Sequence, residues 1–178
     1  MKRRIAKVLM PAHAFVRSLA SPMVWRIFYR RRRFVNDETR RLLKRFLKSS
    51  MDDASLILER HPYKADRIHG LVDASIPAKH APAFFACLPW GRDCDEYARM
   101  WSLWGEANGY NPREWIVYDP TLGIKKAHVV TTLSRGREHW LMDYRPYGPR
   151  MSVEMALAKL GAKYADPMVT EYKWRREW

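Results

Sequence analysis

The sequence is poor in cysteine, with Cys87 and Cys94 as the two among its 178 residues. This number does not support a disulfide framework and leaves the redox compartment open, so the fold needs a hydrophobic core. The length and a hydrophobic fraction of 47% suffice for one globular domain. Long apolar runs are also lacking, since no stretch reaches the roughly 20 residues of a transmembrane helix. Internal repeats and a phosphate-binding glycine loop are absent as well.

Acidic residues are scarce in the first 50 positions, which hold 15 Lys or Arg but only Asp37 and Glu38. The net charge of the whole chain is +14, so the other 128 residues carry about +1. Apolar residues recur at helical spacing within this basic segment, and one of its helices is expected to begin near Asn36. The sequence therefore predicts two parts, a basic amphipathic helical arm over residues 1–50 and a domain over residues 51–178.

Four consecutive arginines are the most concentrated charge of the arm: Arg30, Arg31, Arg32 and Arg33. They suit an anionic membrane surface, nucleic-acid phosphate or an acidic protein, and a solvated helical face is the alternative. No helix-turn-helix, zinc finger or ribonucleoprotein motif supports sequence-specific reading of a nucleic acid. Arg17 and Pro11 interrupt the apolar region that a secretory signal needs. We expect a cytoplasmic protein, or one peripheral at a membrane or virion, rather than a secreted one.

Cys94 stands at the start of a predicted helix over residues 94–108, and Asn108 supplies the stop signal. A helix start lowers the pKa of a thiol, because exposed N–H groups and the helix dipole favour the thiolate. The carboxylates of Asp93, Asp95 and Glu96 act in the opposite direction, so an imidazolium or a cation is needed to offset them. A buried, inert thiol is the alternative. Cys87 has apolar neighbours and is expected in the core, although a disulfide to Cys94 would consume the nucleophile.

Two later strands, residues 127–133 and 139–144, are predicted to form an antiparallel hairpin. Placing Arg135 and Gly136 at its tip makes opposed residue numbers add to 271, which sets His128 directly opposite Asp143. Their Cβ atoms would then lie roughly 4.5 to 5.5 Å apart. His139 is the competing histidine on the same face, and the register favours His128. Together with the thiol, this pair has the nucleophile, base and orienting carboxylate of a triad.

These residues resemble the transglutaminase-like cysteine protease superfamily, and most closely the bacterial transglutaminase-like cysteine proteinases. The resemblance covers about residues 85–147 and is carried by the Asp-Cys-Asp-Glu-Tyr-Ala run at 93–98, the Ala-His-Val-Val run at 127–130 and the Leu-Met-Asp run at 141–143. It implies an α+β papain-like fold, with the cysteine at the start of a helix packed on an antiparallel sheet. It also implies Cys94 as nucleophile, His128 as general base and Asp143 as the orienting carboxylate.

The same resemblance implies a function for the domain of residues 51–178. It is expected to be a cysteine peptidase or amidase that hydrolyses a protein or peptide through an acyl-enzyme. No cofactor is required. Some members of the superfamily bind calcium beside the nucleophile, and the resemblance implies Asp93, Asp95 and Glu96 as the calcium ligands here. In the superfamily the second oxyanion donor comes from residues upstream of the cysteine, and the resemblance implies Trp90 at this place. The alternative is a non-catalytic binding or assembly protein, associated with a phage or a membrane, that acts through the basic arm.

Overall fold

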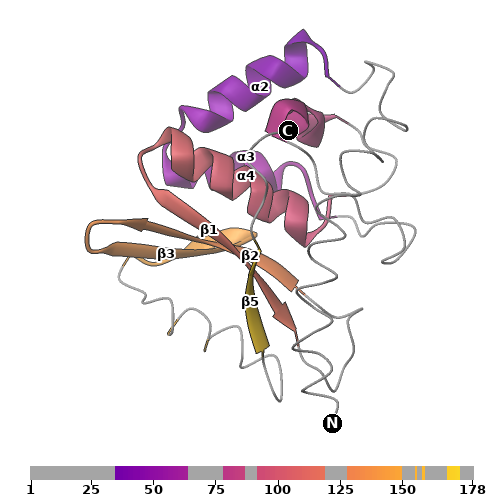
Figure 1. Cartoon of the computed structure of the whole chain (residues 1–178). Helices are drawn as coiled ribbons and strands as arrows, with labels where there is room; N and C mark the ends of the chain where they lie inside the picture. The colour runs from indigo at the N-terminus through magenta and orange to yellow at the C-terminus, as the bar shows by residue number, and fades with distance from the viewer. Residues whose placement is uncertain are drawn as a thin grey trace.

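The computed structural model describes residues 35–63, 78–86, 92–118, 128–149 and 168–172, together with Met155 and Ala158. Within these ranges the elements are as follows (Figure 1): α2 (Asp37–Leu47), α3 (Met51–Glu59), the 3₁₀ helix η2 (Ala78–Phe85), α4 (Cys94–Ala107), β1 (Asn111–Tyr118), β2 (His128–Arg135), β3 (Glu138–Asp143), β4 (Arg145–Tyr147) and β5 (Met168–Tyr172). The helix predicted over residues 94–108 is confirmed, with Asn108 as its C-terminal cap.

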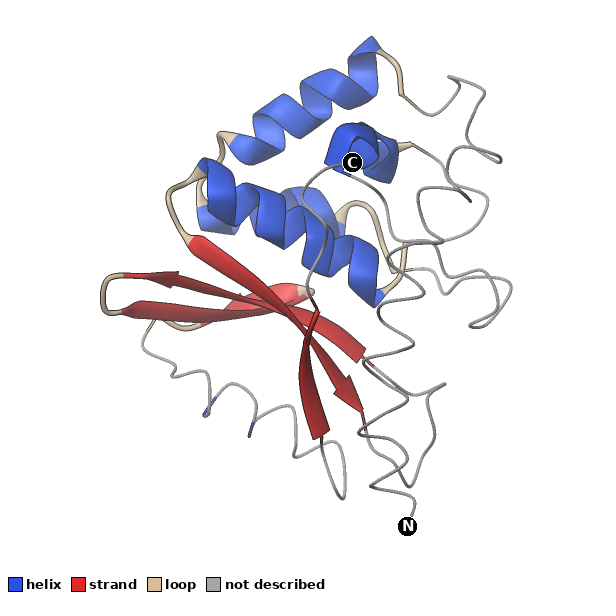
Figure 2. Cartoon of the chain, viewed as in Figure 1, coloured by secondary structure: helices blue, strands red, loops and turns tan. Residues whose placement is uncertain are grey.

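The strands form one antiparallel sheet in the order β4-β3-β2-β1-β5. Figure 2 shows the described helices gathered on one side of this sheet, with α4 lying against it. Segregated helices and an antiparallel sheet make the chain an α+β protein, as the sequence predicts.

The core lies between α4 and the sheet. Trp101 and Met100 of α4 are almost fully buried and share one cluster with Leu133 of β2 and Met142 of β3. Each large side chain buried in this way contributes roughly 1.5 to 3 kcal/mol relative to an exposed one. This layer therefore fixes the position of α4 on the sheet.

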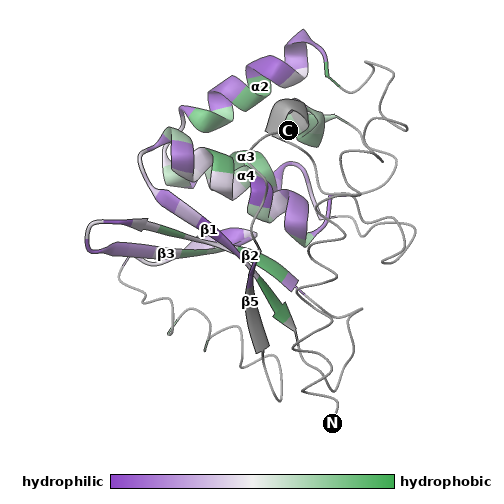
Figure 3. Cartoon of the chain, viewed as in Figure 1, coloured by the Kyte–Doolittle hydropathy of each residue, from purple (hydrophilic) through white to green (hydrophobic). Residues whose placement is uncertain are grey.

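Helix α2 belongs to the same core. Its Phe46 is fully buried against Trp101, and its apolar residues lie on the side that faces α4 (Figure 3). Two side chains of α4 and its cap reach back to the end of α2: Trp104 Nε1–H donates to the Ser49 carbonyl at 3.1 Å, and the Asn108 amide donates to the Leu47 carbonyl at 3.0 Å. Residues 35–50, assigned to the arm from sequence, thus pack with the domain.

Residues 1–34, including Arg30, Arg31, Arg32 and Arg33, lie outside the described residues, so the arm itself stays a prediction. Among the helices that are described, none combines the length and the apolar character needed to cross a bilayer.

The hairpin of β2 and β3 forms, but in a register two residues away from the predicted one. Arg135 pairs with Glu138 and Thr131 with Met142, so opposed residue numbers add to 273, not 271. The loop is Gly136-Arg137, and Gly136 has a φ of +59°. A two-residue hairpin turn needs a positive φ at its first central position, which glycine adopts without strain. Glycine thus takes the first loop position, where the prediction had put it second.

Gly105 marks the closest approach of α4 to the sheet. A Cβ atom added at this position would lie 2.5 Å from Cδ2 of Leu133, a fully buried side chain of β2. Any larger residue at position 105 would force the buried Leu133 side chain to move.

Candidate active site

The first turn of α4 is held by a capping box. Asp93 is the N-cap, its Oδ1 accepts from the Asp95 N–H at 3.3 Å, and its own N–H donates to Glu96 Oε2 at 3.0 Å. Cys94 is the first helical residue and is half-buried. The local sequence therefore places the thiol at the helix start, where backbone N–H groups without an intrahelical partner gather.

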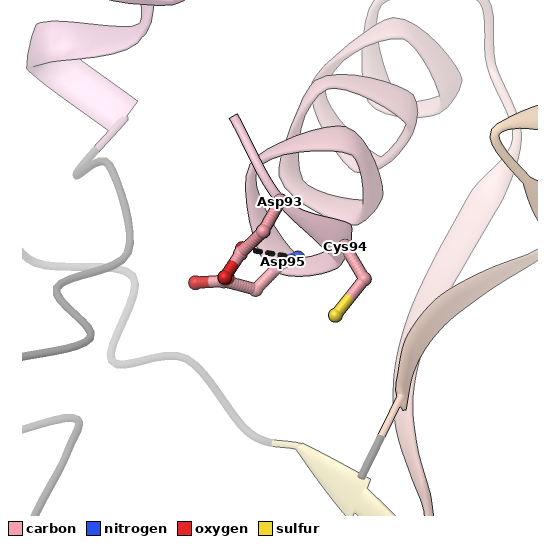
Figure 4. Close-up of side chains that lie close together, drawn as sticks. All are labelled: Asp93, Cys94 and Asp95. Carbon is pink, nitrogen blue, oxygen red and sulfur yellow. Dashed lines mark hydrogen bonds between the residues drawn. The ribbon is translucent and has the colours of Figure 1, made fainter. Parts of the chain in front are cut away.

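Asp93, Cys94 and Asp95 form a compact cluster, with one ligand atom of each lying within 4.8 Å of those of the others. Figure 4 shows the side chains of Asp93, Cys94 and Asp95 together at the start of α4. Burial raises the pKa of the Asp93 carboxyl strongly, and the neighbouring Asp95 carboxylate raises it further. The raised pKa favours the protonated form of Asp93, and protonation reduces the negative charge beside the thiol.

The donor set of this cluster can be compared with the needs of calcium, which takes six to eight oxygen ligands. Among the described residues the cluster offers two carboxyl groups and one soft thiol, and Glu96 contributes an oxygen to the helix cap. This set falls short of a calcium site, and calcium at Asp93, Asp95 and Glu96 stays a prediction.

His128 and Asp143 are in direct contact. His128 Nε2 lies 2.5 Å from Asp143 Oδ1, with side-chain exposures of 15% and 6%. In the observed register the two residues are diagonal neighbours, because a shift of two positions keeps both side chains on the same face. The predicted contact therefore forms in spite of the wrong register. His139 lies opposite Ser134, near the hairpin turn.

The pair lies at the end of the sheet, where β2 begins and β3 ends. Alternation along the strands assigns both residues to the face of Val117 and Val130, whereas the next residue, Met142, faces α4. Access from this pair to the first turn of α4 thus runs around the end of the sheet and not through its packed middle.

Tyr144 occupies that end, and sequence reasoning missed it. Its ring centroid lies 5.5 Å from that of His128 and 5.1 Å from that of Tyr97 on α4. Burial raises the pKa of its hydroxyl, and the nearby Cys94 thiol raises it further. Tyr144 therefore links the thiol end of α4 to the His128–Asp143 pair. The one sequence signal for its place in the site is that it directly follows Asp143.

A second buried carboxyl, Glu114 on β1, also escaped the sequence analysis. Ser102 Oγ–H donates to its Oε1 at 2.5 Å, and an Arg99 guanidinium nitrogen lies 3.6 Å from the same oxygen. Burial raises the pKa of Glu114 to about 7, although Arg99 acts in the opposite direction. Because this group lies between α4 and the middle of the sheet, it serves packing.

A groove of about 540 Å³ lies at the other end of α4. Its lining includes Arg99, Glu106, Tyr110, Ser134 and Arg135. The guanidinium of Arg135 stacks over the Tyr110 ring at 4.2 Å. The groove thus borders the hairpin turn and the last turn of α4, remote from Cys94 along the helix.

Two further residues that the sequence analysis selected, Trp90 as oxyanion donor and Cys87 as a core thiol, lie outside the described residues. Cys94 forms no disulfide with any residue that the structure describes.

No protein-family model matches the chain, and no curated protein or solved structure shows significant similarity to it. Any functional assignment therefore depends on the site geometry and on the resemblance carried by the motifs.

Proposed function

We propose that the protein is a cysteine hydrolase of transglutaminase-like type, with a papain-like arrangement of helix and sheet, acting on a peptide or amide. The observation that carries the proposal is the 2.5 Å contact between His128 Nε2 and Asp143 Oδ1. This contact lies at the end of the sheet beside Tyr144, whose surroundings include the Cys94 thiol. Nucleophile, base and orienting carboxylate thus come from α4, β2 and β3.

The contact fixes the roles of the two imidazole nitrogens. Nε2–H donates to Asp143, which leaves Nδ1 of His128 to accept the thiol proton. An imidazolium formed in this way is stabilised by the carboxylate of Asp143. The carboxylate also holds the ring in one tautomer, as the orienting member of a triad does.

The chemical steps then follow the acyl-enzyme scheme. His128 takes the proton of Cys94, and the thiolate attacks the carbonyl carbon of the substrate. The C–N bond breaks, and His128 returns the proton to the leaving amine. Water, deprotonated by His128, attacks the thioester, which releases the acid and regenerates the thiol. Backbone N–H groups at the start of α4 are the first donors available to the developing oxyanion.

The proposal is tested by the pH dependence of Cys94 alkylation by iodoacetamide, with Cys87→Ala in every protein. We expect a reactive thiolate with an apparent pKa well below the unperturbed value of about 8.5. In His128→Ala the reaction rate at pH 7 should fall by up to about 30-fold, because a thiol with the unperturbed pKa of about 8.5 is only about 3% thiolate at that pH. His139→Ala is the matched control and should react as the parent does. A thiol that stays inert in the folded parent protein contradicts the proposal.

The basic arm favours a second function, binding to an acidic surface by residues 1–34. Binding of this kind weakens steeply as salt rises, whereas hydrolysis of a small neutral amide changes little. Sedimentation with vesicles containing phosphatidylserine, at low and high salt, tests it on the full chain and on a variant lacking residues 1–34. Equal sedimentation of both proteins excludes the arm as the anchor.

A further inference from the structure

Tyr144 is held in an unusual backbone conformation. It stands alone between the paired residues Asp143 and Arg145, so the chain reverses at this single position between β3 and β4. Its φ is +57°, and it is the one non-glycine residue with a positive φ in the described part of the chain. Bulky side chains avoid this region, and glycine adopts it without strain. A tyrosine is therefore retained here in spite of its backbone cost.

The ring of Tyr144 occupies the space between the helix and the catalytic pair. Besides His128 and Tyr97, it contacts Tyr63 edge-on, with centroids 5.6 Å apart. These contacts fix the ring plane and hence the direction of the hydroxyl. By contrast, the Tyr97 hydroxyl donates a hydrogen bond to the His61 carbonyl and so has a structural role.

The hydroxyl of Tyr144 is a proton donor throughout the neutral range. Burial is the largest cause of its raised pKa, followed by the Cys94 thiol, Tyr63, Asp143 and Asp93. A neutral O–H group thus stands among groups that carry or acquire negative charge, where donation of a hydrogen bond is favoured.

We propose that the Tyr144 hydroxyl donates a hydrogen bond to the oxyanion that forms when Cys94 attacks a carbonyl group. This inference rests on the proposed function and adds a side-chain donor to the backbone N–H groups of α4. In this role Tyr144 is a catalytic residue, since its hydroxyl contacts a reacting atom. The reversal at φ +57° then holds the Tyr144 ring between Tyr97 of α4 and His128.

Two probes of the same thiol separate this role from a structural one. p-Nitrophenyl acetate reacts at a carbonyl carbon and develops an oxyanion, whereas iodoacetamide reacts at a saturated carbon and develops none. The measured quantity is the ratio of the two rate constants, with Cys87→Ala in every protein and the rate of Cys94→Ser subtracted. A general change in thiol reactivity or in folding moves both rates and leaves the ratio unchanged.

Tyr144→Phe removes the hydroxyl and keeps the ring. We expect its rate with p-nitrophenyl acetate to fall by about 100-fold, because loss of one oxyanion donor costs an acyl-transfer enzyme about 100-fold or more. Its rate with iodoacetamide should stay within about twofold, since that reaction needs no such donor. Tyr97→Phe is the matched control from the same ring cluster and should keep the parent ratio. Tyr144→Gly suits the backbone and should lower the ratio as Tyr144→Phe does.

An unchanged ratio in Tyr144→Phe overturns the inference, and so does an equal fall in Tyr97→Phe. In both cases the parent protein still reacts with the two probes, so the proposed function stands. A parent protein that reacts with neither probe contradicts the proposed function, and the inference falls with it.

Discussion

The two halves of α4 use their polar residues differently. In the first turn, Asp93 and Glu96 cap the helix around Cys94, a half-buried thiol that adjoins the end of the sheet. Further along, Ser102 and Arg99 surround the buried carboxyl of Glu114 between helix and sheet. Buried acids lie beside both parts of the helix, Asp95 and Glu96 in its first turn and Glu114 of β1 further along, but the first turn also carries the Cys94 thiol.

The difference teaches how chemistry and stability are divided along one helix. The second half also contributes Trp101 and Trp104 to the core, so changes there should lower the free energy of unfolding. Changes in the first turn that keep the helix cap should cost little stability. Three variants of α4 and its neighbours examine this division.

The largest effect is expected from Trp101→Ala. Trp101 is fully buried and contacts Phe46 and Trp104. Its truncation leaves a cavity, and the free energy of unfolding should fall by about 3 to 5 kcal/mol. Urea denaturation measures the loss, while the iodoacetamide rate of the folded protein should remain that of the parent. A matched loss of thiol reactivity in folded protein would show that the two halves are not separable.

An intermediate effect is expected from Glu114→Gln, and it depends on pH. The unfolded chain loses the Glu114 proton near the ordinary pKa of 4.5, whereas the folded protein keeps it until about 7. The native state therefore binds more protons across this window, and stability falls as pH rises through it. The loss amounts to about 3 kcal/mol at most. Glu114→Gln should not show this loss, because the amide does not titrate.

Denaturation of Glu114→Gln and of the parent at about pH 5 and about pH 8 measures this contribution. The parent should lose more stability than the variant between the two conditions. Ser102→Ala serves as a companion variant, because it removes the hydroxyl that donates to Glu114 and keeps the carboxyl. Parallel pH profiles of parent and Glu114→Gln would show that Glu114 is ionised in the fold.

The smallest effect is expected from Asp93→Asn. Asparagine caps a helix as well as aspartate does, so stability should change by less than about 0.5 kcal/mol. Because burial and Asp95 raise the pKa of the Asp93 carboxyl and favour its protonated form, the pH profile of Cys94 alkylation should also be unchanged. A profile displaced to lower pH in the variant would show that Asp93 carries a negative charge beside the thiol in the parent.

The sequence was most informative where the signal is local. The sequence analysis placed one helix start near Asn36 and another at Cys94, and α2 and α4 begin there, capped by Asn36 and Asp93. The two predicted hairpin strands correspond to β2 and β3. The hairpin register was wrong by two residues, because the glycine that marks the turn does not say which loop position it fills. An error of two keeps the side chains on their faces, and the contact of His128 with Asp143 was predicted correctly for this reason.

Long-range packing was harder to predict. Positive charge suggested that residues 1–50 form a separate arm, yet Phe46 is fully buried in the core with Trp101. Glu114 lies in a strand of mixed polarity, and nothing local distinguishes it from a solvated acid until Ser102 and Arg99 are placed over it. The role of Tyr144 could not be predicted, because it depends on the reversal of the chain between β3 and β4. The residue at the reversal is neither a glycine nor a proline.

The close approach of Gly105 to Leu133 couples the tilt of α4 to the position of its first residue, Cys94. Gly105 lies 11 residues after Cys94, a distance of about 16 Å along a rigid rod at 1.5 Å per residue. A side chain at position 105 would press on Leu133 and lift one end of this rod. The other end, which carries the thiol, would tilt in response. The small size of Gly105 thus influences the position of the Cys94 thiol at the far end of the helix.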